Sequence, residues 1–310
     1  MLKRRIALLV AMVVFAASFT ALADNREKET LVDIAREICP GFLGSQTYET
    51  TTHDLVTPFG EGILTVFTNA RGEEIGYIIF VDGVILELAE SPSPYEDVEP
   101  EKGERLYYQP GVHSKVDADE AAKVLASPQS IESQTEENAV PPMTRGYKIL
   151  SNVTCNYQGS YNCVAAALSN VIWYWGGHGY SSLTSGMSFS DVADDITAIF
   201  NGSFANNSVL SVANTYAGMY TSSNYFTGGA TWSPYFYDAY SEIDAGYPCM
   251  VGFASGNTAY DGEAHMTMCF GYQNYNSTYY YVYLADGHHT YGYYQLWTSY
   301  NDCVIKLRIH

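Results

Sequence analysis

The stretch of sequence that decides the fold reads Gln158-Gly159-Ser160-Tyr161-Asn162-Cys163-Val164-Ala165-Ala166-Ala167-Leu168-Ser169-Asn170-Val171-Ile172-Trp173-Tyr174-Trp175. Apolar side chains at positions 164, 168, 171, 172 and 175 recur at helical spacing, which predicts a buried helix that begins at Cys163. The Gly/Ser/Asn loop before Cys163 supplies residues that can cap this helix. Because the N-terminal end of a helix favours an anion, a thiolate forms more easily there, and the thiolate is the nucleophilic form of cysteine.

A histidine and an aspartate follow about a hundred residues later, each next to a strand-like segment. His265 precedes one such segment, where it can serve as general base for a thiol. Considered alone, His265 is better explained as a structural or surface histidine; its position between Cys163 and a strand-end acid reverses that preference. Asp286 ends the next strand-like segment and can accept the other imidazole N–H, although Asp286-Gly287 is also an ordinary turn pair. The order Cys, His, Asp predicts the nucleophilic site of a cysteine hydrolase.

Stabilisation of an oxyanion requires donors near the thiol. Gln158 is a candidate donor, together with the backbone N–H of Cys163. A loop glutamine without a catalytic role explains Gln158 equally well, and Asn156 is a weaker substitute.

The remaining histidines give no coherent ligand set. His288, His289 and His178 suggest a metal, but adjacent residues of a strand point to opposite faces and rarely bind one ion together. The sequence therefore predicts neither a metal nor a cofactor. The many tyrosines and four tryptophans of the second half can line a cleft that stacks on peptide or glycan, but we favour ordinary strand and surface roles for most of them.

The N-terminus has the three parts of a secretory signal peptide. Lys3, Arg4 and Arg5 precede an apolar stretch that reaches about Phe19, and an A-x-A cleavage pattern ends at Ala23. An uncleaved anchor is the alternative, but the apolar stretch is short for a membrane span. The sequence therefore predicts a signal peptide over 1–23 and a secreted chain with no membrane span after cleavage.

Composition divides the rest of the chain in two. Acidic residues are dense between Asp24 and Glu137, whereas Lys148, Lys306 and Arg308 are the only Lys or Arg after residue 146. The net charge of −19 argues against nucleic acid and anionic membranes as partners. We predict a small α+β domain over 24–126, a Ser-, Gln-, Glu- and Pro-rich linker over 127–146, which Arg145 makes easy to cut, and a second α+β domain over 147–310.

Local patterns predict the elements of both domains. Expected helices cover 27–38, 118–125, 190–200, capped by Ser188 or Ser190, and 234–245, ending at Gly246. Expected strands cover 62–67, 75–81, 84–89, 249–253, 265–272, 279–284, 294–299 and 304–309, with a hairpin turn at Asp82-Gly83. The six cysteines permit disulfides, but Cys269 and Cys303 lie in apolar runs typical of core thiols. No CxxC motif supports zinc or redox chemistry.

The segment 158–175 resembles the nucleophile helix of papain-like cysteine peptidases, with similarity to the bacterial C39-like and streptopain-like families. Gly246-Tyr247-Pro248, the segment 264–272 and the segment 281–287 are similar to the strands that carry the histidine and the orienting Asp or Asn of these families. The resemblance covers about 150–310. It implies a papain-like fold with Cys163 as nucleophile, His265 as base, Asp286 as orienting residue and Gln158 as oxyanion donor.

The sequence departs from the family pattern at two places. Glu263 stands where a glycine often precedes the Ala-His pair, and Gln158 is one residue closer to Cys163 than in papain. The acidic first domain resembles the propeptide of such exported enzymes, which implies an intramolecular inhibitor.

The resulting expectation is a secreted cysteine peptidase, made as a zymogen, that hydrolyses peptide or protein substrates through a thioester. One alternative keeps the fold but makes the enzyme an acyltransferase or a wall-peptide amidase. Another is an exported Tyr-rich binding or adhesion module on an inactive peptidase fold.

Overall fold

The structure, a computed structural model, describes residues 31–96, 98–131, 146–254, 264–275 and 279–310. It is an α+β fold, as predicted. The helix that the sequence predicts over 27–38 is helical over 31–38, and its earlier residues lie outside the described ranges, as does the predicted signal peptide. The first domain continues with β1 (Glu49–Thr57), β2 (Gly60–Thr68), β3 (Glu74–Val81), β4 (Val84–Ala89), β5 (Glu104–Gln109), β6 (Val112–Asp117) and α2 (Ala118–Leu125).

The second half begins with a short strand and then places most of its helices before its sheet. Its elements are β7 (Tyr147–Ile149), α3 (Cys163–Gly177), α4 (Phe189–Phe200), α5 (Val209–Tyr220), β8 (Phe226–Trp232), α6 (Phe236–Ala245), β9 (Cys249–Phe253), β10 (His265–Tyr275), β11 (Tyr279–Ala285), β12 (Tyr293–Leu296) and β13 (Asn301–Ile309). Two short 3-10 turns, at Ser181–Leu183 and Asn206–Ser208, precede α4 and α5.

Capping residues fix the ends of the predicted helices. The Asn162 side chain accepts a hydrogen bond from the Val164 N–H, so α3 begins at Cys163 as predicted. Ser188 caps α4 in a capping box with Asp191. Gly246 ends α6 with a φ of +94°, a backbone conformation that favours glycine.

The first domain confirms the expected hairpin and helix. Asp82 and Gly83 both have positive φ, +49° and +79°, as a two-residue turn between β3 and β4 requires. Helix α2 has the predicted bounds, and its N-cap residue Asp117 accepts from the Glu120 N–H. Three strands of this domain, β1, β5 and β6, were not predicted.

Elsewhere the sequence patterns failed in identifiable places. Residues 201–232 contain α5 and β8, which were not expected, and the sequence patterns did not predict β7. The strand predicted over 294–299 ends at Leu296, because Thr298 and Asn301 close a turn in which the Thr298 N–H donates to the Asn301 side chain.

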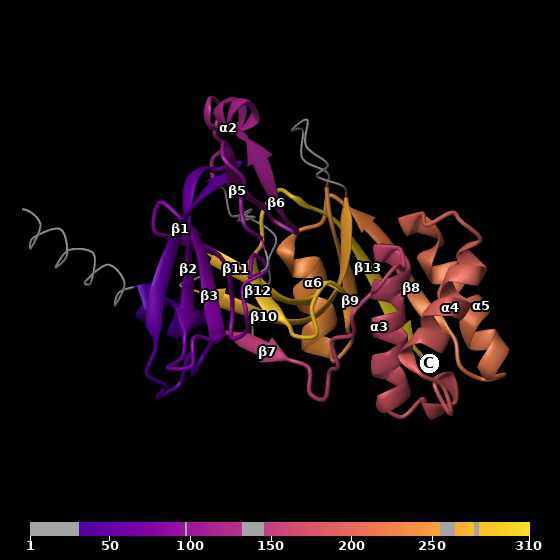
Figure 1. Ribbon diagram of the computed structural model, residues 1–310. Helices are drawn as coiled ribbons and strands as arrows, with labels where there is room; N and C mark the ends of the chain where they lie inside the picture. Colours follow the sequence, from indigo (N-terminus) through magenta and orange to yellow (C-terminus); the bar gives the residue numbers. More distant parts are fainter. Residues whose placement is uncertain (1–30, 97, 132–145, 255–263, 276–278) are drawn as a thin grey trace, which may run out of the picture.

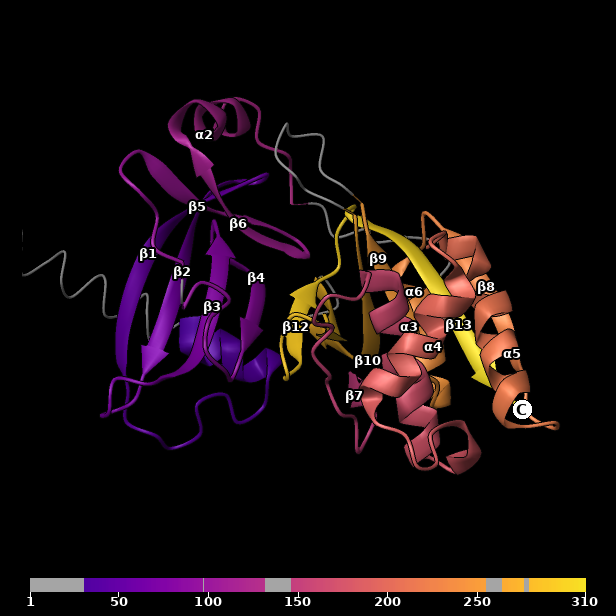
Figure 2. The same ribbon diagram turned by 45° about the vertical axis from the view of Figure 1, so that its right-hand side comes forward.

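One mixed sheet runs through both halves of the chain. Its strand order is β6-β5-β1-β2-β3-β4-β12-β11-β10-β9-β13-β8, with β7 paired to β10 off this path. The pairs are antiparallel except β1 with β5, which is parallel. The two domains meet where β4 pairs with β12, through Leu88 opposite Tyr294 and Glu87 opposite Gln295; Figure 2 shows β12 between β4 and the second half.

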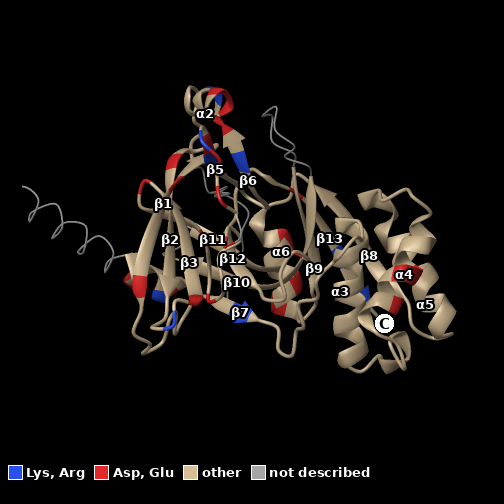
Figure 3. Cartoon of the chain, in the orientation of Figure 1, with Lys and Arg blue, Asp and Glu red and all other residues tan. Residues whose placement is uncertain are grey.

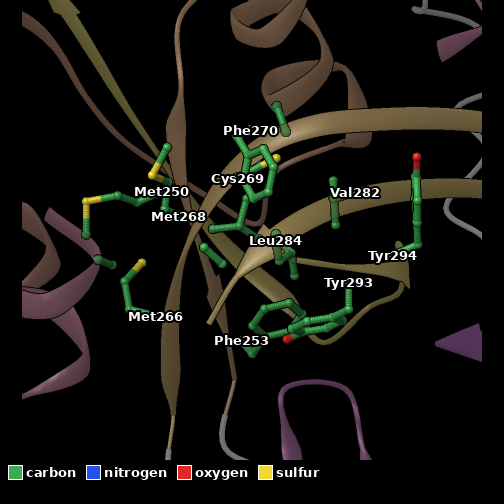
Figure 4. Packing of buried hydrophobic residues seen from close by; sticks show 14 of the residues in the cluster. Met250, Phe253, Met266, Met268, Cys269, Phe270, Val282, Leu284, Tyr293 and Tyr294 are labelled. Atoms are coloured by element: carbon green, nitrogen blue, oxygen red, sulfur yellow. The ribbon is translucent and has the colours of Figure 1, made fainter. Parts of the chain in front are cut away.

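Packing joins the halves as well. Buried residues from both form one continuous hydrophobic cluster. Figure 4 shows part of it on neighbouring strands: Met250 and Phe253 from β9, Met266, Met268, Cys269 and Phe270 from β10, Val282 and Leu284 from β11, and Tyr293 and Tyr294 from β12. Helix α3 packs against β10 and β9. No disulfide links the six cysteines, all of which lie within the described ranges.

Charge follows the two-part pattern of the sequence. Figure 3 shows acidic residues along the first domain, whereas α3 and α5 are almost without charge. On the second half, Arg308 of β13 donates two hydrogen bonds to the buried Glu242 of α6, and Lys306 pairs with Asp238. Helix α6 therefore covers the face of β13 that carries these two cations.

Candidate active site

Cys163 lies at the first turn of α3, where its own helix and β10 meet. Its Sγ is 4.0 Å from the carbonyl oxygen of Ala264, the residue that precedes His265. The cap at Asn162 and the packing of α3 on β10 and β9 bring the thiol to the start of the strand that carries the histidine. The sequence separates these residues by a hundred positions, and the fold brings them to one place.

His265 begins β10 and is buried. Its Nε2 lies 2.9 Å from the main-chain carbonyl oxygen of Asp286. Since a carbonyl can only accept, Nε2 carries the hydrogen and the neutral ring has its lone pair on Nδ1. The imidazole is therefore in the tautomer that can take a proton from a neighbouring thiol through Nδ1.

The Asp286 carboxylate organises its own turn. Its Oδ1 accepts from the N–H groups of His288 and His289, at 2.9 and 3.0 Å, and its Oδ2 lies 2.7 Å from Nδ1 of His289. The expected partner of this carboxylate was the imidazole of His265. In the structure Asp286 contacts that ring through its main chain, and the carboxylate holds the following two histidines instead.

A cavity of about 500 Å³ opens over the thiol. Cys163, His265 and Gln158 all line it, so the structure brings three of the four predicted residues to one cavity. The Gln158 main chain is fixed by a 2.6 Å hydrogen bond from its N–H to the carbonyl of Gly287, next to Asp286. Gln158 is thus attached to the turn that holds the histidines, in a place where a side-chain amide can face a reacting carbonyl.

Burial and charge set the ionisation of these groups. Burial, helped by repulsion from His288, lowers the pKa of His265 to about 4, so this imidazole is neutral at neutral pH. Burial is the largest influence on Asp286 and opposes its ionisation, but the hydrogen bond from His289 and the charges of the nearby histidines together outweigh it and lower the pKa of the carboxyl. Burial also disfavours the charged form of His289, yet its bond to Asp286 raises its pKa. Asp286 and His289 therefore favour each other's charged forms, beside a His265 that is neutral at neutral pH.

The first domain supplies one wall of the cavity. Pro94 and the segment 111–113, which includes the turn between β5 and β6, line it together with Cys163 and His265. A hydrogen bond fixes the ring of His113, because its Nε2 lies 2.8 Å from Oε1 of Glu87. The Glu87 carboxylate is fully buried and also accepts a hydrogen bond from the Tyr77 hydroxyl. The ring of His113 stands edge-on to that of His289, with centroids 6.5 Å apart.

Sequence reasoning missed the part that histidines play here. His288 and His289 were considered only as metal ligands on a strand, but they lie in the turn after β11, and His113 was not considered. The signal that was available is the Asp-Gly-His-His order, since an aspartate at a turn commonly accepts from the N–H two residues later. His178 is elsewhere: its ring bonds the carbonyls of Tyr174 and Ser151.

Within the described residues, no group of three or more His, Cys, Asp or Glu side chains is arranged to hold a metal ion. The part of the chain that the structure describes also has no helix long and apolar enough to cross a membrane. Comparison with protein-family models, with curated proteins and with solved structures finds no match for this chain.

Proposed function

We propose that the protein is a secreted cysteine peptidase of papain-like type, made as a zymogen. The observation that carries the proposal is that Cys163, at the N-terminus of α3, shares one cavity with His265, whose ring is held by Asp286 in the tautomer that accepts a proton. A thiol at a helix N-terminus beside such an imidazole is the arrangement that thioester catalysis requires.

The residues suggest the following steps. The thiol proton passes to Nδ1 of His265, and Sγ forms a bond to the carbonyl carbon of the substrate. The oxyanion is stabilised by the backbone N–H of Cys163 and the side-chain amide of Gln158. As the C–N bond breaks, His265 gives its proton to the leaving amine. Water then attacks the thioester with His265 as base, and the carboxylic acid and the thiol are regenerated.

The intact chain would be inhibited by its first domain. The turn between β5 and β6 lines the cavity that contains the thiol, and the pairing of β4 with β12 fixes the domain in that position. Two tyrosines of the second half add hydrogen bonds, from Tyr281 to the carbonyl of Ile85 and from Tyr291 to that of Pro92. A peptide substrate has to displace this turn, so cutting the linker is only the first step of activation.

The test is selective alkylation of Cys163. Purified protein is treated with iodoacetamide under mild reduction and mapped by peptide mass, before and after a cut in the linker, in the wild type and in His265→Ala. His178→Ala is the matched control, because His178 lies at the other end of α3. We expect fast labelling confined to Cys163 after the first domain is removed, which is lost in His265→Ala and kept in His178→Ala.

Casein then distinguishes the reactions that this site can perform. Release of new amine termini, abolished in Cys163→Ser, supports peptide hydrolysis. Incorporation of an added amine, or release of muropeptides without casein cleavage, would replace the peptidase with an acyltransferase or a wall-peptide amidase. Slow, indiscriminate alkylation that persists both after the cut and after removal of the first domain would overturn the enzyme proposal.

A further inference from the structure

A second imidazole lies flat on the proposed base. The rings of His265 and His288 are stacked, with centroids 4.7 Å apart and planes inclined by 21°. His288 is fixed at its main chain, because its N–H donates to the Asp286 carboxylate at 2.9 Å. Both rings line the cavity that contains Cys163. A stacked ring at this place restricts how the His265 imidazole can turn.

Two imidazoles in this arrangement are unfavourable when both are protonated. A proton on either ring disfavours a proton on the other, since like charges at this separation repel strongly away from bulk water. The two rings therefore titrate as a coupled pair, in which a proton on one ring lowers the pKa of the other. Burial followed by repulsion from His288 lowers the pKa of His265 to about 4, and burial is the largest cause of the lowered pKa of His288.

Other ionisable groups face the pair from every element around it. They are Cys163 from α3, His113 from β6 with Glu87 of β4 behind it, and Asp286 and His289 from the turn after β11. The two carboxylates are each bonded to another histidine, Glu87 to His113 and Asp286 to His289. Burial lowers the pKa of both stacked rings, and the charge of Asp286 acts against this lowering at each ring.

We propose that His288 is a positioning residue of the Cys163–His265 site: its ring holds the plane of the His265 imidazole, and its own protonation prevents His265 from taking up the proton of the thiol. The inference rests on the proposed function in that it assigns His265 as the base. If this inference is correct, Cys163 loses reactivity as the pH falls and His288 becomes protonated, before His265 itself becomes protonated.

The direct test is the titration of His265 by NMR. Full-length protein with Cys163→Ala, labelled at histidine Cε1, is titrated with and without His288→Phe; Phe keeps a flat ring but cannot be charged. We expect the midpoint of His265 to rise by about one pH unit in His288→Phe, because the competing charge is gone. An unchanged midpoint overturns the inference.

A second measurement tests the positioning role in the thiol-containing chain. The pH profile of Cys163 alkylation is compared between wild type, His288→Phe and His288→Ala. We expect His288→Ala to react several-fold more slowly at its plateau and His288→Phe to restore the plateau while its acid limb moves to lower pH. Equal plateaus and superimposable acid limbs in all three would contradict a positioning role.

These outcomes are separate from the fate of the proposed function. A shifted His265 midpoint without any peptide hydrolysis leaves the histidine pair in place and removes the peptidase. Peptide hydrolysis with an unshifted His265 midpoint supports the peptidase and rejects the role of His288.

Discussion

The substitution Gly111→Ala tests whether the first domain inhibits the site. Gly111 lies in the turn between β5 and β6, with a φ of +80°, and a Cβ added there would lie 3.0 Å from Cγ of Phe253. Phe253 ends β9 and is 1% exposed, so its ring has little room to withdraw. The added methyl group therefore acts at the contact between the two domains, on the rim of the Cys163 cavity.

The magnitude follows from two separate effects. A non-glycine residue at positive φ costs about 1 kcal/mol whether or not the domains are in contact. The contact with Phe253 adds the cost of overpacking, about 1–3 kcal/mol, and this part is relieved when the turn leaves the cavity. The second effect alone shifts the docking equilibrium by about 5- to 150-fold towards the open form.

Gly83→Ala is the matched control. Gly83 has a φ of +79° in the turn between β3 and β4 of the same domain, and a Cβ there meets nothing within 4 Å. Both variants are compared by urea unfolding and by the rate of Cys163 alkylation in the uncut chain. We expect Gly111→Ala to lose up to about 1–3 kcal/mol more stability than Gly83→Ala, and a rate increase of at least about fivefold in Gly111→Ala alone. Equal alkylation rates in the two variants would refute the reasoning that this turn closes the site.

Three further predictions concern the turn, the buried ion pair and the pH dependence. Gly287→Ala, at a φ of +80° with a Cβ 2.8 Å from Oε1 of Gln158, should slow peptide hydrolysis and cost about 2–3 kcal/mol in urea unfolding; unchanged hydrolysis would show that Gln158 has no part in the reaction. Arg308→Ala leaves the fully buried Glu242 without its bidentate partner and should lower the free energy of unfolding by about 2–4 kcal/mol, with Arg308→Lys intermediate; a loss below that of Lys306→Ala would contradict this. Because the pKa of His265 is about 4 in the folded chain and about 6.5 when unfolded, the unfolded state binds more protons in this window, so stability should fall by up to about 3 kcal/mol from pH 6.5 to pH 4. His265→Gln should flatten that part of the urea-midpoint profile, and a parallel profile would show that His265 does not titrate as its burial implies.

Local signals predicted most elements of the second half. The start of helix α3 was predicted to the residue because a Gly/Ser/Asn cap loop, a helical apolar period and a thiol coincide within 158–175; the helix ends at Gly177. Strand β8 was not predicted, and it contains two adjacent glycines, Gly228 and Gly229, which are unfavourable in the interior of a strand. In the structure, a Cβ at Gly228 would lie 2.1 Å from the carbonyl oxygen of Lys306, so the close approach of β8 to β13 itself requires the glycine.

The pairing of β4 with β12 could not be read from either strand. Each has the alternating or continuous apolar pattern of any half-buried strand. The local sequence does not specify which strand, about two hundred residues away, it pairs with. The same holds for the wall that His113 contributes to the cavity.

The sequence predicted which residues lie at the candidate site better than it predicted the hydrogen bonds between them. Cys163, His265 and Gln158 do line one cavity, and Asp286 does contact the His265 ring. Which oxygen of Asp286 makes that contact depends on the turn that follows it. The N–H groups of His288 and His289 reach the carboxylate first, since they lie only two and three residues away, and the main-chain carbonyl remains for His265.

The junction between β4 and β12 has a consequence for a chain that loses its first domain. Strand β12 would then present unsatisfied main-chain donors and acceptors, and its short length, four residues, is one protection of the kinds that natural sheet edges use. Such an edge can pair through its main chain with any extended segment, including the same edge of another copy of the protein. The chain without its first domain would thus stay monomeric for a time that depends on its concentration. Dilution would keep it monomeric, and a high local concentration would favour association through the β12 edge.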